Sequence, residues 1–288
     1  MTAVSGPDLV IAACRRGLIG AFPTHNAADP AELDRWLRRM SSESTPQSAP
    51  HAANLVVHRS NARLSADLEC VIRGRVELVI TSVGSPAPVV DPLHDAGCRV
   101  FADVASIAHA RRALEAGVDG LVLLTAGAGG QTGWANPFAF VRAVRQEYDG
   151  PVVLAGGITD GRSIVAAEAL GADLVYLGTR FIATRESLAT PAYRAALVAS
   201  SLDDVRLSDR VGGIPASLLA CWLDGDHGTP ETGGGFAQER LLDNRTAWSA
   251  GHSVSGVTTV SSVDELVDAL LDQYRQARRD ICQLVNVG

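Results

Sequence analysis

Two apolar segments of the chain, Val152–Ala155 and Leu174–Leu177, are each followed by glycine, with Gly157 after the first and Gly178 after the second. A helical pattern separates them, so the sequence predicts a strand–helix–strand unit with parallel strands. The two glycine ends then lie on one side of the sheet, roughly 5 Å apart. Backbone N–H groups that no side chain covers bind phosphate well. We therefore predict a phosphate site here, with Thr179 beside it, although ordinary loop glycines have the same spacing.

Side chains that exchange protons or bind metals are scattered along the chain. His25 lies just past one predicted strand and His58 closes another, where barrel enzymes place their chemistry, so either is a candidate base. Asp103 would point to the mouth of a barrel or into it, and pairing with an arginine explains it equally well. No histidine has a carboxylate or cysteine at metal-ligand spacing, which predicts no metal site. His94 and His109 fall in predicted helices, and we expect them to be surface or packing residues.

Composition excludes several classes of protein. All 25 basic residues are arginine, which excludes Schiff-base aldolases, pyridoxal-phosphate enzymes and Walker-type phosphate loops, because each needs a lysine amine. The net charge of −7 without long runs of one sign argues against nucleic acid or membrane surfaces as partners. The five scattered cysteines indicate free thiols in a reducing cytoplasm.

Apolar segments alternate with helical patterns along the first two thirds of the chain, which is typical of repeated βα units. A (β/α)₈ TIM barrel needs eight strands, and the sequence predicts seven, so the first strand is expected to be missing or to survive only as Met1–Val4. An open, doubly wound sheet is the alternative. The predicted strands are Leu18–Pro23, Asn54–His58, Leu78–Ser82, Val100–Val104, Gly120–Leu124, Val152–Ala155 and Leu174–Leu177.

The regular alternation ends near residue 200, and this change sets the predicted domains. Residues 1–200 would form the cofactor-binding barrel, residues 201–260 a small irregular segment over its mouth, and residues 261–288 a C-terminal helix packed on the barrel. Within these parts, the pattern predicts a helix over Ile214–Leu223, a mobile loop over His227–Phe236 and a terminal helix over Val263–Arg279.

Several motifs together carry a family resemblance that spans nearly the whole chain. They are GAGGQTG at 127–133, LAGGITDGR at 154–162, GAD at 171–173, GTRFIAT at 178–184 and WSAGHSVSG at 248–256. With them the chain resembles the nitronate monooxygenase family, the 2-nitropropane dioxygenase-like enzymes. The resemblance implies a TIM barrel that binds FMN.

The resemblance also implies which residues hold the FMN. Backbone and hydroxyl donors of one group would bind its phosphate, and a second group at the strand ends would line the rest of the flavin. The phosphate group comprises Gly157, Gly178 and Thr179, and the lining group comprises Gly20, Asn54, Ser82 and Gly130.

The chain departs from the family pattern at two places. Family members begin with a strand that ends in a proline–methionine pair, whereas Met1 stands at that methionine here. We therefore expect either a start further upstream or another element or a partner that fills the gap. Gln131 occupies the position of the family's histidine base. An amide cannot take up a proton near neutral pH, which favours a preformed nitronate over a nitroalkane as substrate. Trp134 and Phe138 are expected to pack in the core or to wall the substrate pocket.

Three functions remain open at this stage. The first is an FMN-dependent oxidoreductase that oxidises a small nitronate-like or conjugated organic substrate. The second is a flavin reductase that passes hydride from NAD(P)H to a quinone or an enoyl thioester, since the flavin itself does the difficult chemistry. The third is a degenerate barrel that binds a ligand without turnover. The oligomeric state stays open, a homo-oligomer included.

Overall fold

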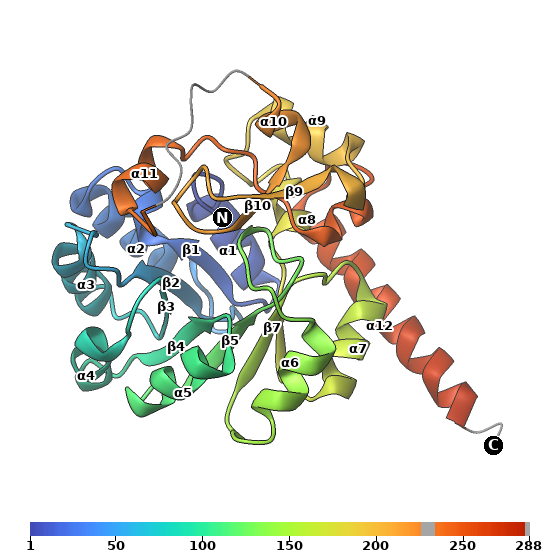
Figure 1. Cartoon of the computed structure of the whole chain (residues 1–288), viewed down its shortest axis with the longest axis horizontal. Coiled ribbons are helices and arrows are strands. Elements are labelled where there is room, and N and C mark those ends of the chain that lie inside the picture. Colours follow the sequence, from blue (N-terminus) through green and yellow to red (C-terminus); the bar gives the residue numbers. More distant parts are fainter. Residues whose placement is uncertain (226–233, 286–288) are drawn as a thin grey trace.

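The computed structural model of the chain describes residues 1–225 and 234–285 and contains one curled sheet of seven parallel strands (Figure 1). The strand order β1-β2-β3-β4-β5-β7-β8 follows the sequence, so each strand lies beside the next one along the chain. This confirms the predicted α/β class and the seven strands. The strands are β1 Gly20–Pro23, β2 His51–Val56, β3 Leu78–Ser82, β4 Arg99–Val104, β5 Gly120–Leu124, β7 Val152–Ala155 and β8 Leu174–Tyr176.

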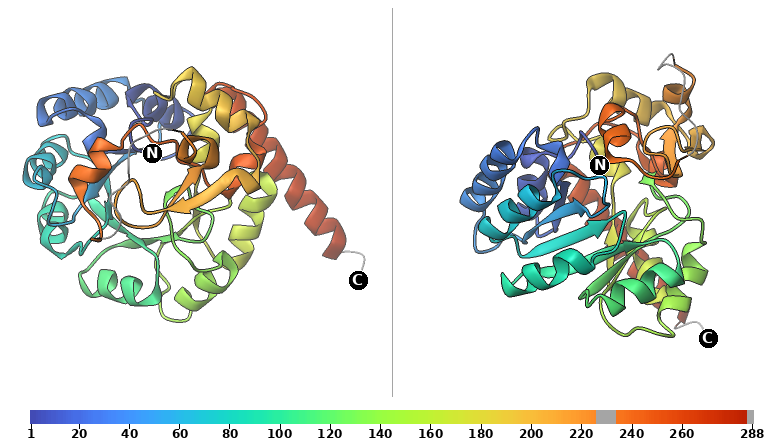
Figure 2. Two further views of the ribbon diagram at one scale, coloured as in Figure 1. Left: turned by 45° about the horizontal axis from the view of Figure 1, so that its top comes forward. Right: turned by 60° about the vertical axis from the view of Figure 1, so that its left-hand side comes forward.

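Helices cover the outer face of the curled sheet and form a ring in the view down its axis (Figure 2). Successive side chains of a strand point to opposite faces of the sheet. In β5, Leu121 and Leu123 therefore pack against the helices, and Val122 packs in the barrel interior. Burial on both faces explains the continuous apolar runs of the sequence. The covering helices are α1 Pro7–Arg15, α2 Pro30–Glu43, α3 Leu64–Arg73, α4 Ala87–Asp95, α5 Ile107–Glu115, α6 Pro137–Val144 and α7 Gly161–Leu170. Two further helices, α8 Thr179–Ile182 and α9 Pro191–Ala199, pack against the segment His252–Gly256.

The sheet stays open between β8 and β1, where no strand of the described chain joins the two edges. Residues 1–5 form a hydrogen-bonded turn, so the prediction that Met1–Val4 could keep a strand is wrong. The turn is fixed beside β1 instead. The Ser5 hydroxyl donates to the Ala21 carbonyl at 2.7 Å, and the Asn26 amide donates to the carbonyls of Met1 and Ser5 at 3.0 and 2.8 Å. The first residues thereby cover part of the exposed edge of β1.

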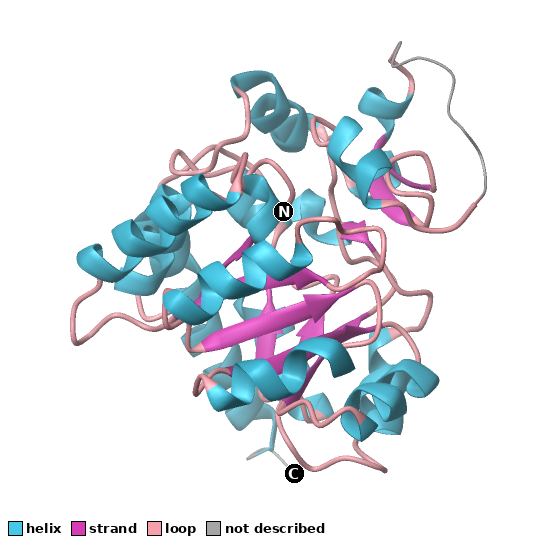
Figure 3. Cartoon of the chain, turned by 90° about the vertical axis from the view of Figure 1, so that its left-hand side faces the viewer, coloured by secondary structure: helices cyan, strands magenta, loops and turns pink. Residues whose placement is uncertain are grey.

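A second, small antiparallel sheet lies beyond the carboxyl ends of the parallel strands (Figure 3). It comprises β6 Gly130–Gln131, β10 Ala216–Leu219 and β9 Val205–Ser208. The prediction of a helix over Ile214–Leu223 is therefore wrong for its first part, because Ala216–Leu219 pairs with both neighbouring strands. Only the end of that segment is helical. The other elements of this region, which we call the cap (residues 201–260), are η2 Leu202–Asp204, α10 Ala220–Leu223, α11 Gln238–Asp243 and η3 His252–Gly256.

The last helix, α12 Val263–Val285, confirms the predicted terminal helix and extends it. It crosses the start of α7 so closely that a Cβ atom on Gly161 would lie 1.9 Å from the backbone nitrogen of Tyr274. Its far end extends away from the barrel (Figure 1). Most of the predicted loop His227–Phe236 lies outside the described residues. The division into three domains remains a prediction.

Candidate active site

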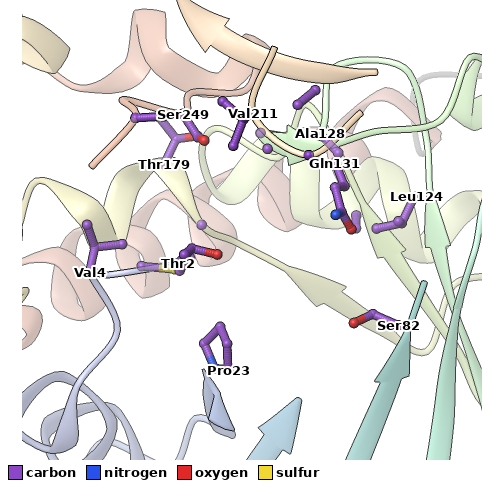
Figure 4. Close-up of a pocket in the computed structure, with 18 of the residues that line it drawn as sticks. Thr2, Val4, Pro23, Ser82, Leu124, Ala128, Gln131, Thr179, Val211 and Ser249 are labelled. Atoms are coloured by element: carbon purple, nitrogen blue, oxygen red, sulfur yellow. The ribbon is translucent and has the colours of Figure 1, made fainter. Parts of the chain in front are cut away.

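A pocket opens at the carboxyl ends of the parallel strands, beneath the cap (Figure 4). The main sheet supplies its floor and sides, and the cap supplies its roof through residues such as Val211, Asn244 and Ser249. Six of the seven residues predicted to bind the cofactor line this pocket, as does Gln131. The six are Asn54, Ser82, Gly130, Gly157, Gly178 and Thr179.

Bare backbone borders the pocket where β7 and β8 end. Gly156 and Gly157 have φ angles of +123° and +71°, which L side chains rarely adopt. A Cβ atom on Gly157 would meet nothing within 4 Å, so the space in front of this peptide is open. At Gly178, a Cβ atom would lie 3.7 Å from the Met1 side chain. The two strand ends thus leave room for a group that binds to main-chain N–H donors.

Thr179 follows directly and is held by the cap. The backbone N–H of Gly251 donates to its hydroxyl oxygen at 2.9 Å, and the side chain is buried. Because a hydroxyl group accepts and donates, its own proton stays available to an oxygen atom in the pocket. Thr179 and Ser249 lie side by side at the top of the pocket in Figure 4.

The glycine loop 126–133 and the segment 248–256 pack backbone against backbone. A Cβ atom on Gly251 would lie 2.4 Å from the Gly127 carbonyl oxygen, and one on Gly129 would lie 2.7 Å from the Gly251 nitrogen. The N–H of His252 donates to the Gly127 carbonyl at 2.9 Å. This contact explains why both motifs consist of small residues, and it fixes the loop that carries Gly130 and Gln131.

A hydrogen bond joins two strand ends at the floor of the pocket. The Ser82 hydroxyl at the end of β3 donates to the Asn54 amide oxygen of β2 at 2.9 Å. The next residue, Val83, has a φ angle of +50°, an outlier for a β-branched side chain. Backbone strain of this kind costs about 1–3 kcal/mol and is concentrated at functional sites.

Asp103 of β4 lines the same floor, and no arginine pairs with it in the described part of the chain. Its Oδ1 atom is buried and has no hydrogen-bond partner. Burial raises the pKa of this carboxyl from 3.8 to about 7, while the ammonium group of the first residue and the Asn54 amide act in the opposite direction. The sequence left open whether Asp103 faces the mouth or interior of the barrel or pairs with an arginine. The structure supports the first, because the side chain lines the cavity.

His25 also lines the pocket but is a poor proton acceptor. It lies in the short helix η1, Thr24–Asn26, with Nε2 3.1 Å from the Thr2 hydroxyl and Nδ1 buried without a partner. Burial, reinforced by neighbouring positive charges that include Arg63 and Arg245, lowers its pKa from 6.5 to about 3. The imidazole is therefore neutral at physiological pH, and its contact is the hydrogen bond with the Thr2 hydroxyl.

Gln131 occupies β6, where its backbone pairs with Ala216 of β10. Its side-chain amide points into the pocket, toward the space bounded by Leu124 and Ser82 (Figure 4). An amide in this place orients a ligand by donating and accepting hydrogen bonds, without proton transfer.

Three of the sequence-based expectations differ from the structure. Gly20 lies at the amino end of β1, where a Cβ atom would lie 2.7 Å from the Val10 carbonyl oxygen, so this glycine serves packing on α1 and does not border the pocket. Pro23, at the opposite end of the strand, lines it instead. Trp134 and Phe138 are 83% and 61% exposed, so they neither pack in the core nor wall the pocket.

The other histidines within residues 1–225 and 234–285 lie outside the pocket. His58 contacts Ser60 and the ring of Phe236, and His94 lies 2.9 Å from an Asp119 oxygen. Sequence reasoning missed Arg245 and Tyr176, which do line it. Tyr176 ends β8 as its apolar run predicts, but nothing local distinguishes Arg245 from other surface arginines.

No group of three or more metal-binding side chains occurs within residues 1–225 and 234–285. None of the helices described there is long and apolar enough to cross a membrane.

The fold and the pocket define a parallel α/β barrel-type protein with a ligand site at the carboxyl ends of its strands. The family model for nitronate monooxygenase matches residues 1–233. The chain therefore belongs to the nitronate monooxygenase family, whose members are flavin-dependent.

Individual relatives agree with this assignment. A nitronate monooxygenase from Paraburkholderia phytofirmans is 31% identical over 204 residues, 67% of this chain and 56% of that protein. A 5-hydroxy-7a-methyl-1-oxo-octahydro-1H-indene-4-carboxyl-CoA dehydrogenase from Rhodococcus jostii is 29% identical over 216 residues, 75% of this chain and 60% of that protein. The chain thus spans less than two thirds of the length of these relatives.

Solved structures show the same fold at lower identity. FabK from Thermotoga maritima superimposes with a TM-score of 0.83 and 23% identity, over 99% of this chain and 93% of that one. A nitroalkane oxidase from Streptomyces ansochromogenes gives a TM-score of 0.84 and 22% identity, over 96% and 94% of the two chains. These likenesses concern the fold alone.

Proposed function

We propose that the chain binds FMN and is an oxidoreductase of the nitronate monooxygenase type, acting on a small nitronate-like or conjugated organic substrate. The observation that carries this proposal is the open backbone at Gly157 and Gly178, where two neighbouring strands end in one pocket. A phosphate needs several N–H donors and no side chain between them, and glycine at both strand ends supports this.

The residues of the pocket fit the rest of the cofactor as well. Gly157, Gly178 and Thr179 would hold the phosphate, the last through its free hydroxyl proton. Asn54 and Ser82 would hydrogen-bond the polar edge of the flavin, and Gly130 leaves room beside it. Apolar walls for a flat ring come from Val56, Leu124, Ala128, Ala155 and Ile158. When bound, FMN supplies the two-electron redox chemistry.

Arg245 of the cap supports an anionic substrate. It lines the pocket from the side opposite the strand ends, and no carboxylate of the described chain pairs with it. A guanidinium in this position binds a carboxylate, a nitronate or a phosphate through paired N–H donors. Gln131 would orient the same substrate by hydrogen bonds.

Purified protein tests the proposal directly. It should be yellow or become so with FMN, and it should oxidise an alkyl nitronate. A colourless protein that takes up no FMN would overturn the assignment.

A second candidate is an NAD(P)H-dependent flavin reductase with an enoyl thioester or quinone as acceptor. Gln131 favours it, because hydride transfer needs no base at that position. The carboxyl-CoA dehydrogenase among the relatives supports a thioester substrate. Anaerobic bleaching of the flavin by NADH or NADPH separates this candidate from the first, in which the nitro substrate reduces the flavin.

A barrel that binds a ligand without turnover is the remaining alternative, motivated by Gln131 and by the open seam. Substantial wild-type turnover that Gln131→His leaves unchanged would argue against it. We retain the cytoplasm as the proposed location, supported by the free cysteines, and leave the oligomeric state to sedimentation.

A further inference from the structure

The pocket contains a carboxyl group that the proposed function does not use. Asp103 enters it from β4 between two neighbours on other strands, Asn54 of β2 and Tyr176 of β8. Oδ1 of Asp103 has no hydrogen-bond partner, although a buried oxygen left unpaired costs about 1–3 kcal/mol or more. An orphaned carboxyl oxygen beside a ligand pocket indicates a partner that arrives with the ligand.

The topology brings this carboxyl and Gln131 to one pocket. β4 pairs with β5 in register, with Asp103 opposite Val122. The glycine loop follows β5 and folds back over the strand ends, so that a Cβ atom on Gly133 would lie 3.5 Å from the Cβ of Ala105. Gln131 lies two residues before this contact, and Asp103 lies two residues before Ala105. Both side chains line the one pocket.

Three other titratable side chains of the pocket do not exchange protons near neutral pH. Burial lowers the pKa of His25 to about 3, and burial raises the pKa values of Tyr176 and Tyr193 well above their usual range. The amino group of Met1 also lines the pocket; burial lowers its pKa from 8.0, and its positive charge lowers the pKa of Asp103. Gln131 has no titratable proton. Asp103, whose pKa burial raises to about 7, has the value that suits a general base at physiological pH.

We propose that Asp103 is the general base of this pocket and that it lets the protein accept a neutral nitroalkane as well as a preformed nitronate. The inference rests on the proposed function and deepens it. The bond between the α-carbon and its hydrogen breaks, and the proton forms a new O–H bond at Asp103. The electron pair moves into the nitro group, which leaves the nitronate that the proposed reaction oxidises. Asp103 later returns its proton to water.

Asp103→Asn tests this inference, because it keeps the shape of the side chain and removes the base. The flavin-loaded protein is assayed with nitroethane, freshly diluted in its neutral form, and with ethyl nitronate. We expect kcat/KM for nitroethane to rise with pH through about 7 in the wild type. The variant should lower the ratio of nitroethane to nitronate turnover by about 100-fold or more. Asp95→Asn, an exposed carboxyl on α4, is the matched control and should leave the ratio unchanged.

A second measurement needs no turnover. Infrared difference spectra of the flavin-free protein should show one band of a protonated carboxyl group that disappears between pH 6 and 8, which is about one unit on either side of the expected pKa. The band should be absent in Asp103→Asn. Failure of nitroethane oxidation in a wild type that oxidises nitronate would overturn the proposal, as would a variant that keeps the wild-type ratio or a missing band. If neither substrate reacts and no FMN binds, the proposed function fails, and the infrared titration still decides whether Asp103 exchanges its proton near pH 7.

Discussion

The hydroxyl group of Ser82 donates a hydrogen bond of 2.9 Å to the side-chain oxygen of Asn54, and this contact joins the ends of β3 and β2 at the floor of the pocket. It orients the Asn54 amide so that its NH₂ group is left for other acceptors. The amide also lowers the pKa of Asp103 on β4. The side chains of Ser82, Asn54 and Asp103 therefore link the ends of three neighbouring strands at the floor of the pocket.

Removal of this hydrogen bond should affect both stability and the pocket. In Ser82→Ala, the Asn54 oxygen loses its donor, so we expect the free energy of unfolding to fall by about 1–2 kcal/mol. Urea denaturation measures this. Ser85→Ala removes an exposed hydroxyl nearby and should change the free energy by less than about 0.5 kcal/mol. Equal effects of the two substitutions would contradict the assigned role of Ser82.

Thr179 is expected to serve the fold and the cofactor through one hydroxyl group. Thr179→Val keeps the shape but leaves the buried N–H of Gly251 without its acceptor, at a cost of about 1–3 kcal/mol. It also removes a donor to the phosphate, which should weaken FMN binding by about tenfold. Thr179→Ser keeps the hydroxyl and should retain most of both properties. Fluorescence titration with FMN and thermal unfolding check the pair; a serine variant as impaired as the valine variant would show that the methyl group matters instead.

The buried Asp103 should make the protein less stable as the pH rises. Its pKa is 3.8 in an unfolded chain and about 7 in the fold, so the folded state holds a proton that the unfolded state has lost. Stability contributed by this group is complete below about pH 4 and decreases until about pH 7. Asp103→Asn should therefore stabilise the protein at pH 8 by about 2–4 kcal/mol and have little effect at pH 4. A stabilisation that is the same at both values would rule out the raised pKa.

His25 should have the opposite effect at acid pH. Its pKa is 6.5 when unfolded and about 3 in the fold, so the unfolded state binds a proton that the folded state does not. The free energy of unfolding therefore decreases as the pH falls from about 6.5 to about 3, because protonation of His25 favours the unfolded state in this range. His25→Gln should make the acid side of the stability profile shallower. Urea denaturation at pH 7 and pH 4 measures the difference, and parallel profiles of wild type and variant would contradict it.

Arg245 is expected to bind the substrate rather than to take part in the chemistry. Arg245→Gln should raise KM for an alkyl nitronate by about tenfold and change kcat by less than about threefold, because a charge-assisted hydrogen bond contributes about 1.5–3 kcal/mol. Arg99→Gln is the matched control, because Arg99 is exposed at the amino end of β4 and the pocket lies at the carboxyl ends of the strands. An unchanged KM, or an equal loss in kcat, would argue against this role.

The sequence predicted β5 and β7 well because both strands are buried on both faces. Val152–Ala155 and Gly120–Leu124 match the observed β7 and β5, since uninterrupted apolar runs between glycines leave little alternative. The prediction was wrong for the first part of Ile214–Leu223, because an apolar run of that length suits helix and strand equally. The strand Ala216–Leu219 depends on pairing with β9 and with β6, and β6 lies far away in the sequence.

The site was predictable where backbone chemistry decides it. Gly157 and Gly178 border the pocket, as expected of glycine after a strand, which marks bare main chain; their role in phosphate binding stays a prediction. Gly20 was predicted to line the flavin but packs against α1. A glycine that makes room for a helix has the same local sequence pattern as one that makes room for a ligand. Arg245 could not be found, since only the folding of the cap over the strands brings it to the pocket.

Titration of the purified protein with FMN tests the central claim most directly, with Gly157→Asn and Gly97→Asn as a matched pair. Both glycines have a positive φ, +71° and +79°, and open space in front of the missing Cβ, so the backbone strain of the two substitutions is similar. Only at Gly157 would the new side chain enter the proposed phosphate site. We predict micromolar or tighter binding for the wild type and Gly97→Asn, and at least tenfold weaker binding for Gly157→Asn. Equal FMN affinity of all three proteins, or no binding by any, would contradict the account.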